Sequence, residues 1–360
     1  MKTLKIAFVT SWCLDVACGS GTAVAINELR RSLQSLGHDV NLVTLKKHPA
    51  LWRRLLFNFT LRSRLDAKNY DVIVCFDWDG FLLPRFTTPV IVSIKGVLAD
   101  ESYFERGWAK IMLGAQAVIE WRNALKASLV VTTSAYSRKR IVAAYGLAEE
   151  KVAVVPEGID LLLWNKTVIS NPASKKKRPT ILTVAHQYYP KNTAALITAL
   201  PRVLRVAPDA QLRIVGDGPM FGQLKRQVEK LKLGNKVCLL GTITDSARLR
   251  QEYARADVFC LPSFNESFGI VMLEAMAFGL PVVAYRATAM PEVVPDGRAG
   301  LLIEPYDENK FTQAIIALLC DKRLRQDLGM YGARHVKNYD WQKIGSRFVS
   351  LATSLIKARI

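Results

Sequence analysis

The chain has 360 residues, of which half are apolar and 22% are charged. This composition is that of a folded globular protein and excludes a disordered chain. The length suffices for two domains of ordinary size, each with its own core. The formal net charge of +19 predicts an anionic partner, and nucleic acid, anionic lipid and a phosphorylated substrate all fit that description.

The cysteines and the N-terminus bear on where the protein resides. The six cysteines are scattered, with no CxxC pair and no histidine near them at ligand spacing, which argues against a disulfide framework or a zinc site and for a reducing cytoplasm. The start, MKTLKIAFVTSWCLDVACGS, is similar to a lipoprotein signal, but its apolar run is short and Asp15 interrupts it, so a buried first strand over residues 6–10 is the better interpretation. No stretch approaches the roughly 20 apolar residues that span a bilayer. We expect a cytoplasmic protein, with peripheral attachment to the inner face of the membrane as a further option.

The first half of the chain alternates short β-rich runs with helical patterns. The runs are KIAFVT, DVNLVT, DVIVCF, PVIVSI, SLVVTT and KVAVVP. Between the first two, AVAINELRRSLQSLG has apolar residues at helical spacing and ends at Gly37. Strands that alternate with helices predict a parallel sheet that is covered on both faces.

The alternation breaks and then restarts in the second half. DLLLWNKTVISNPASKKKRPT predicts an interdomain linker over residues 161–179, in which the basic run KKKR is interpreted as solvated. The runs then resume as TILTVA, QLRIVG, KVCLLG, DVFCLP, PVVAY and GLLIEP, and residues 340–360 form an amphipathic helix. We therefore predict an α/β protein with two Rossmann-like, doubly wound parallel-sheet domains that face each other across a cleft. The domains are residues 1–160, joined by the C-terminal helix 340–360, and residues 180–339.

Two glutamates flank the start of a predicted helix in FNESFGIVMLEAMAFGLPVV, residues 264–283. A strand, DVFCLP, precedes this loop, and GIVMLEAMAF is a helix that a Gly and a Pro end. In open α/β sheets ligands bind beyond the carboxyl ends of strands, and the free amides of a helix start suit a phosphate. Glu274 would then face a ribose, and Glu266 would lie nearer the phosphates or the group they carry. The alternative is an ordinary helix that Ser267 caps, with both acids in water.

The segment PSFNESFGIVMLEAMAFGLPVVA, residues 262–284, resembles the C-terminal signature of the retaining glycosyltransferases of family four, P-S-x-x-E-x-F-G-x-x-x-x-E-A-x-A-x-G-x-P-V-V-A, and fills every position of it. Further segments are similar in the same order along nearly the whole chain: SGTAVAINELRRSLQSLGHDVNLVT, VTTSAYSRKRI, VAVVPEGID, ILTVAHQYYPKN, LRIVGDGP, LLGTI and DGRAGLLIEP. The resemblance implies the GT-B fold and a hexosyltransferase that moves a sugar from a UDP- or GDP-sugar to an acceptor hydroxyl and keeps the anomeric configuration. It implies that no metal or other cofactor is required. It also implies a role in the synthesis of cell-envelope glycolipid or polysaccharide.

The resemblance further implies a donor site in the C-terminal domain. By similarity, Glu274 binds the ribose and Glu266 lies near the donor sugar. The backbone N–H groups at the helix start, residues 269–271, meet the diphosphate, and residues 241–243 line the base pocket. The full predicted donor-binding set is Ser20, Gly21, Lys191, Gly241, Thr242, Ile243, Glu266, Phe268, Gly269, Ile270, Val271 and Glu274.

The resemblance assigns a catalytic role to Lys191, Glu266 and His186. In VAHQYYPKN the family usually has an arginine followed five residues later by a lysine, both on the diphosphate. Lys191 fills the second position and His186 replaces the first, and an imidazole, with a reference pKa of about 6.5, is a weaker and pH-dependent cation. Lys191 and the amides of the helix start would stabilise the charge on the departing diphosphate. The alternative for Lys191 is an exposed loop lysine.

The sequence departs from the family pattern at three places. In the loop CGSGT, Ser20 replaces the first glycine and Gly21 keeps the second, and this loop closes over the sugar and diphosphate or is a plain tight turn. Lys95 replaces a histidine that faces the donor sugar, and its ammonium can contact a sugar, a phosphate or the acceptor. Thr288 and Ala289 replace a Gly-Gly pair in RATAMPEVV.

The segment FDWDG, residues 76–80, contains the D-x-D pattern that elsewhere holds a metal for nucleotide sugars. Here it ends a strand of the first half, away from the nucleotide-binding half, and the implied fold class needs no metal. We therefore interpret the two acids as strand-end residues and expect no metal site.

The acceptor, a glycan or a lipid-linked molecule, is expected on the first half of the chain. KKHPALWRRLLFNFTLRSRLDAK, residues 46–68, carries seven Lys or Arg against one acid, interleaved with Trp52, Phe57 and Phe59. A basic helix with aromatic residues suits an anionic membrane surface, and relatives that act on lipid acceptors have such a surface in this domain. The alternative is an ordinary helix whose apolar face lies in the core.

Other functions stay open at this level. A non-catalytic sugar-nucleotide-binding protein is one of them, because His186 and Lys95 depart from common catalytic-site residues. A sugar-nucleotide epimerase of the same fold is another, although its motifs match less well. Nucleic acid is not an expected partner, since the basic residues are spread over both halves and no recognised reader motif occurs.

Overall fold

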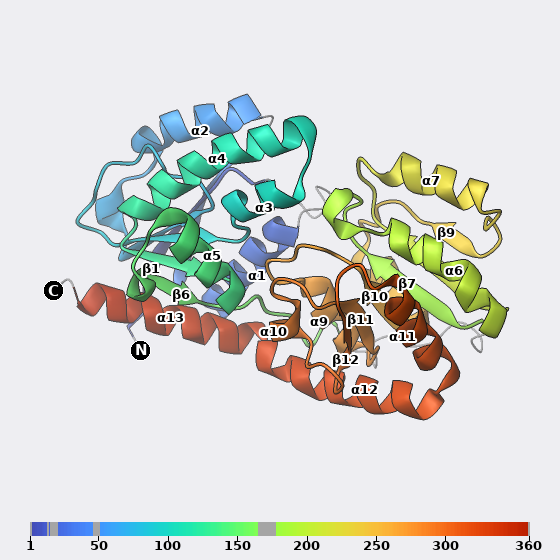
Figure 1. Ribbon diagram of the computed structural model, residues 1–360. Helices are drawn as coiled ribbons and strands as arrows, with labels where there is room; N and C mark the ends of the chain where they lie inside the picture. The colour runs from blue at the N-terminus through green and yellow to red at the C-terminus, as the bar shows by residue number, and fades with distance from the viewer. Residues whose placement is uncertain (1, 13, 15–20, 46–50, 165–177, 359–360) are drawn as a thin grey trace. The chain divides into compact units, whose positions relative to one another are not determined.

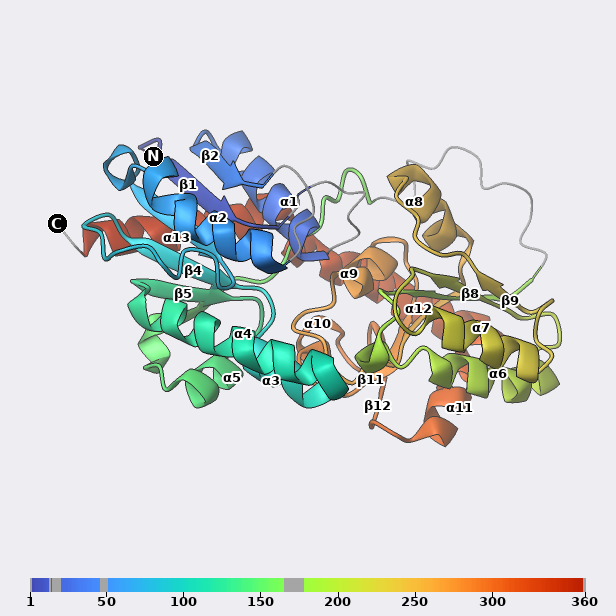
Figure 2. The ribbon, with the colours of Figure 1, turned by 90° about the horizontal axis from the view of Figure 1, so that it is seen from above.

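Each half of the chain builds one six-stranded sheet (Figures 1 and 2), and all strand pairs in both sheets are parallel. The chain divides into unit 1, residues 1–158 and 341–360, and unit 2, residues 159–340. The arrangement confirms the predicted α/β class with two Rossmann-like parallel sheets. The computed structural model describes residues 2–12, 14, 21–45, 51–164 and 178–358.

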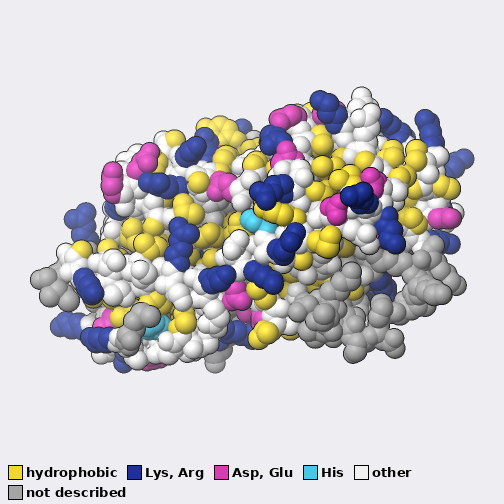
Figure 3. Space-filling model, turned by 90° about the horizontal axis from the view of Figure 1, so that it is seen from below, with side chains coloured by type: hydrophobic (Ala, Val, Ile, Leu, Met, Phe, Trp, Pro, Cys, Tyr) yellow, Lys and Arg dark blue, Asp and Glu magenta, His cyan; other side chains and the backbone are white. Residues whose placement is uncertain are grey.

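The described residues on one face of the protein mix basic and acidic side chains. On the face seen in Figure 3, Lys and Arg side chains are spread widely, with acidic side chains among them. This face has no single basic stripe of the kind that a nucleic-acid groove presents.

The sheet of unit 1 has the strand order β2-β1-β3-β4-β5-β6. Strand β1, Lys5–Thr10, aligns Ile6 with Val40 of β2 on one side and with Val72 of β3 on the other. It is buried along almost its whole length, as a strand covered on both faces must be. All six strands coincide with the apolar runs of the first half. They are β1 (Lys5–Thr10), β2 (Asp39–Thr44), β3 (Val72–Phe76), β4 (Val90–Ile94), β5 (Leu129–Thr132) and β6 (Val152–Val154).

Helices cover both faces of this sheet. One apolar cluster joins α1 (Gly21–Ser35) and α13 (Trp341–Lys357) to one face. A second cluster joins α2 (Leu51–Arg64), α4 (Gly107–Lys126) and α5 (Ala135–Tyr145) to the opposite face. The remaining helical segments are α3 (Leu98–Phe104), η2 (Ala67–Asn69) and η3 (Glu149–Lys151).

The last helix of the chain packs against the first one. The hydroxyl of Ser32 in α1 donates to the carbonyl of Trp341 at 2.6 Å in a buried contact. Gly345 of α13 lies so close that a Cβ there would be 2.2 Å from Ser32 Oγ. The chain therefore returns to unit 1 after it has completed unit 2.

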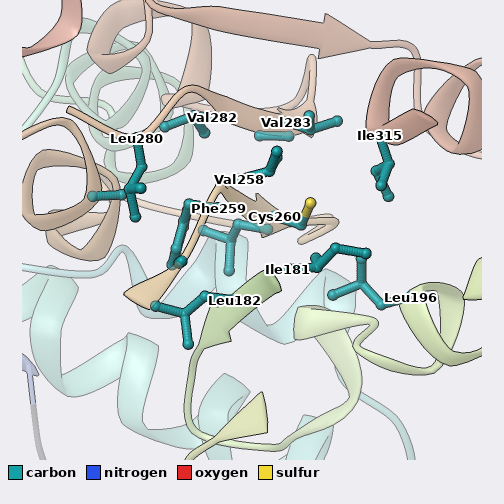
Figure 4. Packing of buried hydrophobic residues seen from close by; sticks show 14 of the residues in the cluster. Ile181, Leu182, Leu196, Val258, Phe259, Cys260, Leu280, Val282, Val283 and Ile315 are labelled. Carbon is teal, nitrogen blue, oxygen red and sulfur yellow. The ribbon is translucent and has the colours of Figure 1, made fainter. Parts of the chain in front are cut away.

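The sheet of unit 2 has the order β12-β11-β10-β7-β8-β9. Its strands are the six apolar runs of the second half. They are β7 (Thr180–Val184), β8 (Gln211–Val215), β9 (Val237–Leu239), β10 (Val258–Leu261), β11 (Val282–Tyr285) and β12 (Gly300–Ile303). Figure 4 shows Ile181 and Cys260 of the central strands on the side of Leu196 and Ile315, which come from covering helices, whereas Leu182 and Phe259 point to the opposite face of the sheet.

Helices α6, α7 and α11 lie on one side of this sheet and α8 and α9 on the other (Figure 2). The helical segments of unit 2 are η5 (Tyr189–Lys191), α6 (Ala194–Val206), α7 (Phe221–Lys230), α8 (Ser246–Arg255), α9 (Ile270–Ala277), α10 (Met290–Val293), α11 (Glu308–Cys320), α12 (Lys322–His335) and η6 (Val336–Tyr339).

The strand order places a topological switch point between β7 and β10. From β7 the chain winds through α6 to β8 and on to β9, and then crosses through α8 to β10 on the other side of β7. The loops after β7 and β10 therefore leave neighbouring strand ends in opposite directions. In open α/β sheets this is where ligands bind.

Residues 165–177, most of the predicted linker, lie outside the described residues. Unit 2 begins at Ile159, upstream of this gap. Ile159 forms an isolated parallel bridge with Asp340, the last residue of unit 2. None of the described helices combines the length and the apolar character needed to cross a membrane.

Candidate functional site

Lys191 and Glu266 form an ion pair at the switch point of unit 2. Lys191 ends η5, in the loop after β7, and Glu266 lies in the loop after β10. Lys191 Nζ is 2.5 Å from Glu266 Oε1, which also accepts a hydrogen bond from the Ser263 hydroxyl at 2.9 Å. Burial by itself would lower the pKa of Lys191, but the charge of Glu266 and hydrogen bonds to Glu266 and Tyr188 outweigh it and raise the pKa. The lysine is therefore a fixed, largely buried cation and not an exposed loop residue.

Thr288 fixes the backbone of Glu266. The Thr288 hydroxyl accepts from the Glu266 N–H and donates to the Glu266 carbonyl, both at 2.9 Å, and Ala289 N–H donates to the same carbonyl at 3.2 Å. Thr288 has φ of +49°, which is an outlier for a β-branched residue. The sequence marked these two positions only as a departure from a glycine pair, and no local pattern indicates a hydrogen bond to a residue 22 positions earlier.

Helix α9 begins directly after this loop. Its N-cap is Gly269, with φ of +84°, a left-handed conformation that glycine adopts at little cost. A Cβ at Gly269 would lie 3.8 Å from Glu266 Cγ, so the helix start and Glu266 are close neighbours. The first N–H groups of a helix have no partner within it and carry a partial positive charge. The backbone at residues 269–271 thus offers donors beside the ion pair.

Both glutamates of the motif are buried, which excludes the alternative in which Ser267 caps the helix and the acids face water. Glu266 is 9% exposed and Glu274 is 8% exposed. Glu274 Oε2 accepts a hydrogen bond from the Tyr253 hydroxyl at 2.6 Å. Burial raises the pKa of Glu274 to about 7, although this hydrogen bond opposes the shift. The carboxyl is thus held by a tyrosine that no sequence motif singled out.

The surroundings of His186 disfavour its charged form. Burial lowers its pKa, and the positive charge of Lys191 lowers it further, against the opposing charge of Asp217. The centroids of the His186 and Tyr188 rings are 5.7 Å apart. Because its lowered pKa disfavours the charged form, His186 can offer a diphosphate a hydrogen bond but is a weaker cation than an arginine would be.

Residues 241–243, the predicted base pocket, follow β9. They leave the sheet at the same edge as the loops after β7 and β10, because all strands are parallel. Gly241 has φ of +63°, and its carbonyl accepts from Gly216 N–H at 2.7 Å. Thr242 is exposed and Ile243 half-buried. Phe268, also predicted as a donor contact, is buried with its ring edge-on to Tyr339, so it is a packing residue of the core.

In unit 1, Ser20 of the predicted glycine loop lies outside the described residues, and Gly21 is the first residue of α1. Lys95 lies among the described residues. Lys95 Nζ is 2.8 Å from Glu157 Oε1, and both side chains are largely buried. Its backbone N–H donates to Asp77 Oδ1 at 2.9 Å. The ammonium group that the sequence left free to bind a ligand is therefore already paired with a carboxylate.

The D-x-D acids hold the strand ends of unit 1 together. Asp79 accepts from the Ser11 N–H at 2.6 Å, from the Ser11 hydroxyl at 2.8 Å and from Asn58 at 3.0 Å. Asp77 accepts from the Trp12 indole at 2.8 Å as well as from Lys95. Each carboxylate oxygen thus has a protein donor, as structural acids require. Among the described residues, no three His, Cys, Asp or Glu side chains cluster as metal ligands would.

Within the basic segment 46–68, residues 51–64 form α2, residues 65–68 follow it, and residues 46–50 lie outside the described residues. Phe57 is buried in the core, whereas Trp52, Leu56 and Phe59 are 60%, 54% and 68% exposed. The helix buries one apolar face in the core and exposes another. The ordinary core helix that the sequence offered as the alternative therefore does not account for the exposed apolar residues. Arg54 is not a free surface charge, since its Nε donates to Ser11 Oγ at 2.8 Å.

Both halves of the chain resemble known protein families. The sequence profile described as Glycosyl transferases group 1 matches residues 165–335, and the profile described as Glycosyltransferase Family 4 matches residues 19–162. A GDP-mannose-dependent alpha-(1-6)-phosphatidylinositol monomannoside mannosyltransferase of Mycolicibacterium smegmatis is 30% identical over 279 residues, which cover 74% of this chain and 72% of the relative. The chain belongs to glycosyltransferase family 4.

Solved structures establish the fold of this glycosyltransferase. Sucrose-phosphate synthase from Thermosynechococcus elongatus matches it with a TM-score of 0.83 and 21% identity, over 99% of this chain and 100% of that one. HepE from Anabaena, in complex with UDP and glucose, matches with a TM-score of 0.77 and 19% identity, over 98% of this chain and 100% of that one. At these identities the likeness shows the fold alone, which is GT-B.

Proposed function

We propose that this glycosyltransferase moves a hexose from a UDP- or GDP-sugar to a hydroxyl of a glycan or lipid-linked acceptor, with retention and without a metal, in the synthesis of cell-envelope glycolipid or polysaccharide. The buried pair of Lys191 and Glu266 beside the start of α9 carries this proposal. A fixed cation next to helix amides is suited to a diphosphate. The names of the relatives support both donor bases, since one relative depends on GDP-mannose and another was solved with UDP.

The proposed reaction breaks the bond between the anomeric carbon and the diphosphate oxygen, so negative charge grows on the diphosphate. Lys191 and the N–H groups of residues 269–271 would stabilise that charge, which is the task a metal performs in other nucleotide-sugar enzymes. Glu266 keeps Lys191 in place and can accept hydrogen bonds from sugar hydroxyls. Glu274, held by Tyr253, would accept those of the ribose.

A comparison of two substitutions tests the proposal. We expect Lys191→Ala to lower turnover by about 10² to 10³, because one fixed donor to developing charge contributes roughly that much. His186→Ala, which removes a group whose charged form is disfavoured, should lower it far less. The measurement is the release of UDP or GDP from donor sugars, with and without lipid extract as acceptor, and chelator should leave the wild-type rate unchanged.

Controls separate chemistry from stability in this comparison. Lys191→Ala leaves Glu266 buried without its partner, so rates are normalised to the folded fraction, and Lys310→Ala serves as the matched loss of an exposed lysine. Equal, negligible losses at Lys191 and His186 would contradict both assignments. Nucleotide binding with no turnover by the wild type would favour a binding protein.

We also propose that unit 1 attaches to an anionic membrane surface. Besides Trp52, Leu56 and Phe59 of α2, helix α4 exposes large apolar side chains, and both helices cover the same face of the sheet. Large exposed apolar patches mark interaction sites, and Trp next to basic residues favours the lipid headgroup region. The exposed apolar residues of α4 are Trp108, Ile111, Val118, Trp121 and Leu125, and its exposed basic residues are Lys110, Arg122 and Lys126.

Binding to vesicles of phosphatidylglycerol tests this attachment. We expect sedimentation with these vesicles at low salt, weaker sedimentation at high salt, and a clear loss in Trp52→Ser combined with Trp108→Ser. Charge reversal is informative at the exposed Arg53 but not at Arg54, which is bonded to Ser11. Val206→Ser, an exposed apolar position of unit 2, is the control. No affinity for anionic vesicles at low salt would rule the attachment out.

A further inference from the structure

An exposed aromatic ring stands at the ligand edge of the unit 2 sheet, outside the predicted donor set. Tyr306 follows β12, and 78% of its surface is exposed. Its backbone φ is +69°, a left-handed conformation that costs free energy in a residue with a large side chain. Its ring stacks on Phe264, with 4.8 Å between ring centroids and 27° between planes. With one face of the ring on Phe264, the exposure of 78% leaves most of the Tyr306 surface open to solvent.

The ring beneath Tyr306 is anchored beside the proposed donor site. Phe264 stacks in turn on the buried Tyr285, with 5.6 Å between centroids. The Phe264 N–H donates to the Pro190 carbonyl at 2.8 Å, one residue before Lys191. Glu266 follows Phe264 by two residues. The stack therefore rests on both loops that carry the ion pair.

The charges around Tyr306 differ from those of the chain as a whole. Glu304, Asp307 and Glu308 lie within two residues of it, in a protein with a net charge of +19. Glu304 is 3.0 Å from Arg286 Nε, and Asp307 caps α11 by accepting from Lys310 N–H at 2.9 Å. Asp307 is also 3.4 Å from Lys310 Nζ, so three acids face two cations here, a balance that disfavours an anionic ligand. A neutral ring that offers C–H groups to the aromatic face and hydroxyl donors to carboxylates fits both features.

We propose that Tyr306 and Phe264 of unit 2 form a stacking platform for a neutral sugar ring of the glycan acceptor or product, next to the donor site and in addition to the acceptor contacts expected in the first half of the chain. Nothing in the turn itself requires an aromatic residue, because Gly or Asn adopts this φ more easily. The stack on Phe264 offsets the strain and fixes the ring in one orientation. The assignment to acceptor or product depends on the proposed function, whereas sugar binding can be measured without turnover.

Three variants of the full chain test the platform. Tyr306→Asn keeps the turn and removes the ring, Tyr306→Phe keeps the ring, and Tyr103→Ala removes a ring that is 71% exposed in unit 1. Mannotriose and maltotriose are the probes, measured by titration calorimetry or ligand-observed NMR, and UDP and GDP binding is measured in parallel. We expect Tyr306→Asn to weaken trisaccharide binding by about tenfold, a loss comparable to removal of one stacked base. Tyr306→Phe and Tyr103→Ala should bind the trisaccharides as the wild type does.

The outcomes separate this inference from the proposed function. Equal trisaccharide binding by wild type and Tyr306→Asn, or none by the wild type, overturns the platform and leaves the donor site untouched. Weaker UDP or GDP binding by Tyr306→Asn would make the ring a base platform and also overturns the assignment. Loss of trisaccharide binding in Tyr306→Asn, with no nucleotide binding by any variant, would uphold the platform and refute the proposed donor site.

Discussion

Glu274 shows how burial sets the chemistry of one residue. Its pKa is raised to about 7 from the ordinary 4.5, chiefly by burial. Between these values the folded protein keeps a proton that the unfolded chain loses, so the free energy of unfolding should fall as pH rises through this window. The total loss is on the order of 3 kcal/mol, with the full stabilisation present below pH 4.5 and absent above about pH 7.

The substitution Glu274→Gln isolates this contribution, because glutamine keeps the shape and cannot ionise. Denaturant unfolding of both proteins is measured from pH 4.5 to 8. We expect the difference between their unfolding free energies to change by up to about 1.4 kcal/mol per pH unit in the window and to be constant above it. Parallel curves across the whole range would show that Glu274 ionises alike in both states.

Thr288 gives a second prediction for single residues. Thr288→Ser keeps the hydroxyl that bonds both backbone groups of Glu266, and we expect turnover within about twofold of wild type, since the two hydrogen bonds remain. Thr288→Val keeps the shape but leaves the buried Glu266 N–H without this partner, at a cost of about 1–3 kcal/mol in stability and with a clear loss of turnover. Unfolding and steady-state rates are measured for both. A valine variant equal to the serine variant would show that the hydroxyl does not position Glu266.

The sequence identifies residues of the candidate site, but it does not identify the side chains that contact them. The motif places Glu266 and Glu274 at fixed spacing, and both can be read directly. That Lys191 pairs with Glu266, 75 residues away, depends on how two loops meet at the switch point. The partnership of Tyr253 with Glu274 has the same origin, since helix and strand packing and not a local pattern brings them together. Predicting these contacts requires the three-dimensional arrangement of loops.

At the level of elements, α13 completes unit 1 from the far end of the chain. Its buried face, which includes Ile344 and Phe348, packs on the face of the sheet that α1 also covers. We expect Gly345→Val to destabilise the protein by about 1–3 kcal/mol or more, because its side chain would overlap Ser32 where the helices touch. Ser346→Ala, at an exposed position of the same helix, is the control. Chemical unfolding of both variants provides the measurement, and equal stability would mean that α1 and α13 can separate without loss.

The twelve strands in the described part of the chain were predictable because buried parallel strands appear as short apolar runs between turn residues. The helix GIVMLEAMAF, residues 269–278, was also predictable, since α9 spans Ile270–Ala277 with Gly269 as its N-cap. Ser267, the alternative cap and a good N-cap by type, precedes the helix start by two residues, in the loop that buries Glu266. The helices α3 and α4 have no family motif, and the exposure of α4 follows from which face of the sheet it covers. Local sequence preference does not carry that information.

For the whole molecule, the described residues form separate hydrophobic clusters in the two units. One cluster fills unit 2, and two others cover the two faces of the sheet of unit 1. The proposed donor nucleotide contacts Glu274, the start of α9 and Lys191, all in unit 2. A ligand that binds only the folded form of one unit stabilises that unit by mass action.

We therefore expect UDP or GDP to raise the stability of unit 2 selectively. In hydrogen exchange followed by mass spectrometry, protection should increase in β7, β10 and α9 and stay unchanged in β1, β3 and α13. At a nucleotide concentration of 100 times Kd the gain is about 2.7 kcal/mol. Glu274→Ala, which removes the proposed ribose contact, should reduce the gain at the same concentration. Equal protection of both units would mean that the two cores unfold as one cooperative block, and protection confined to unit 1 would place the nucleotide outside the site built by Lys191 and Glu266.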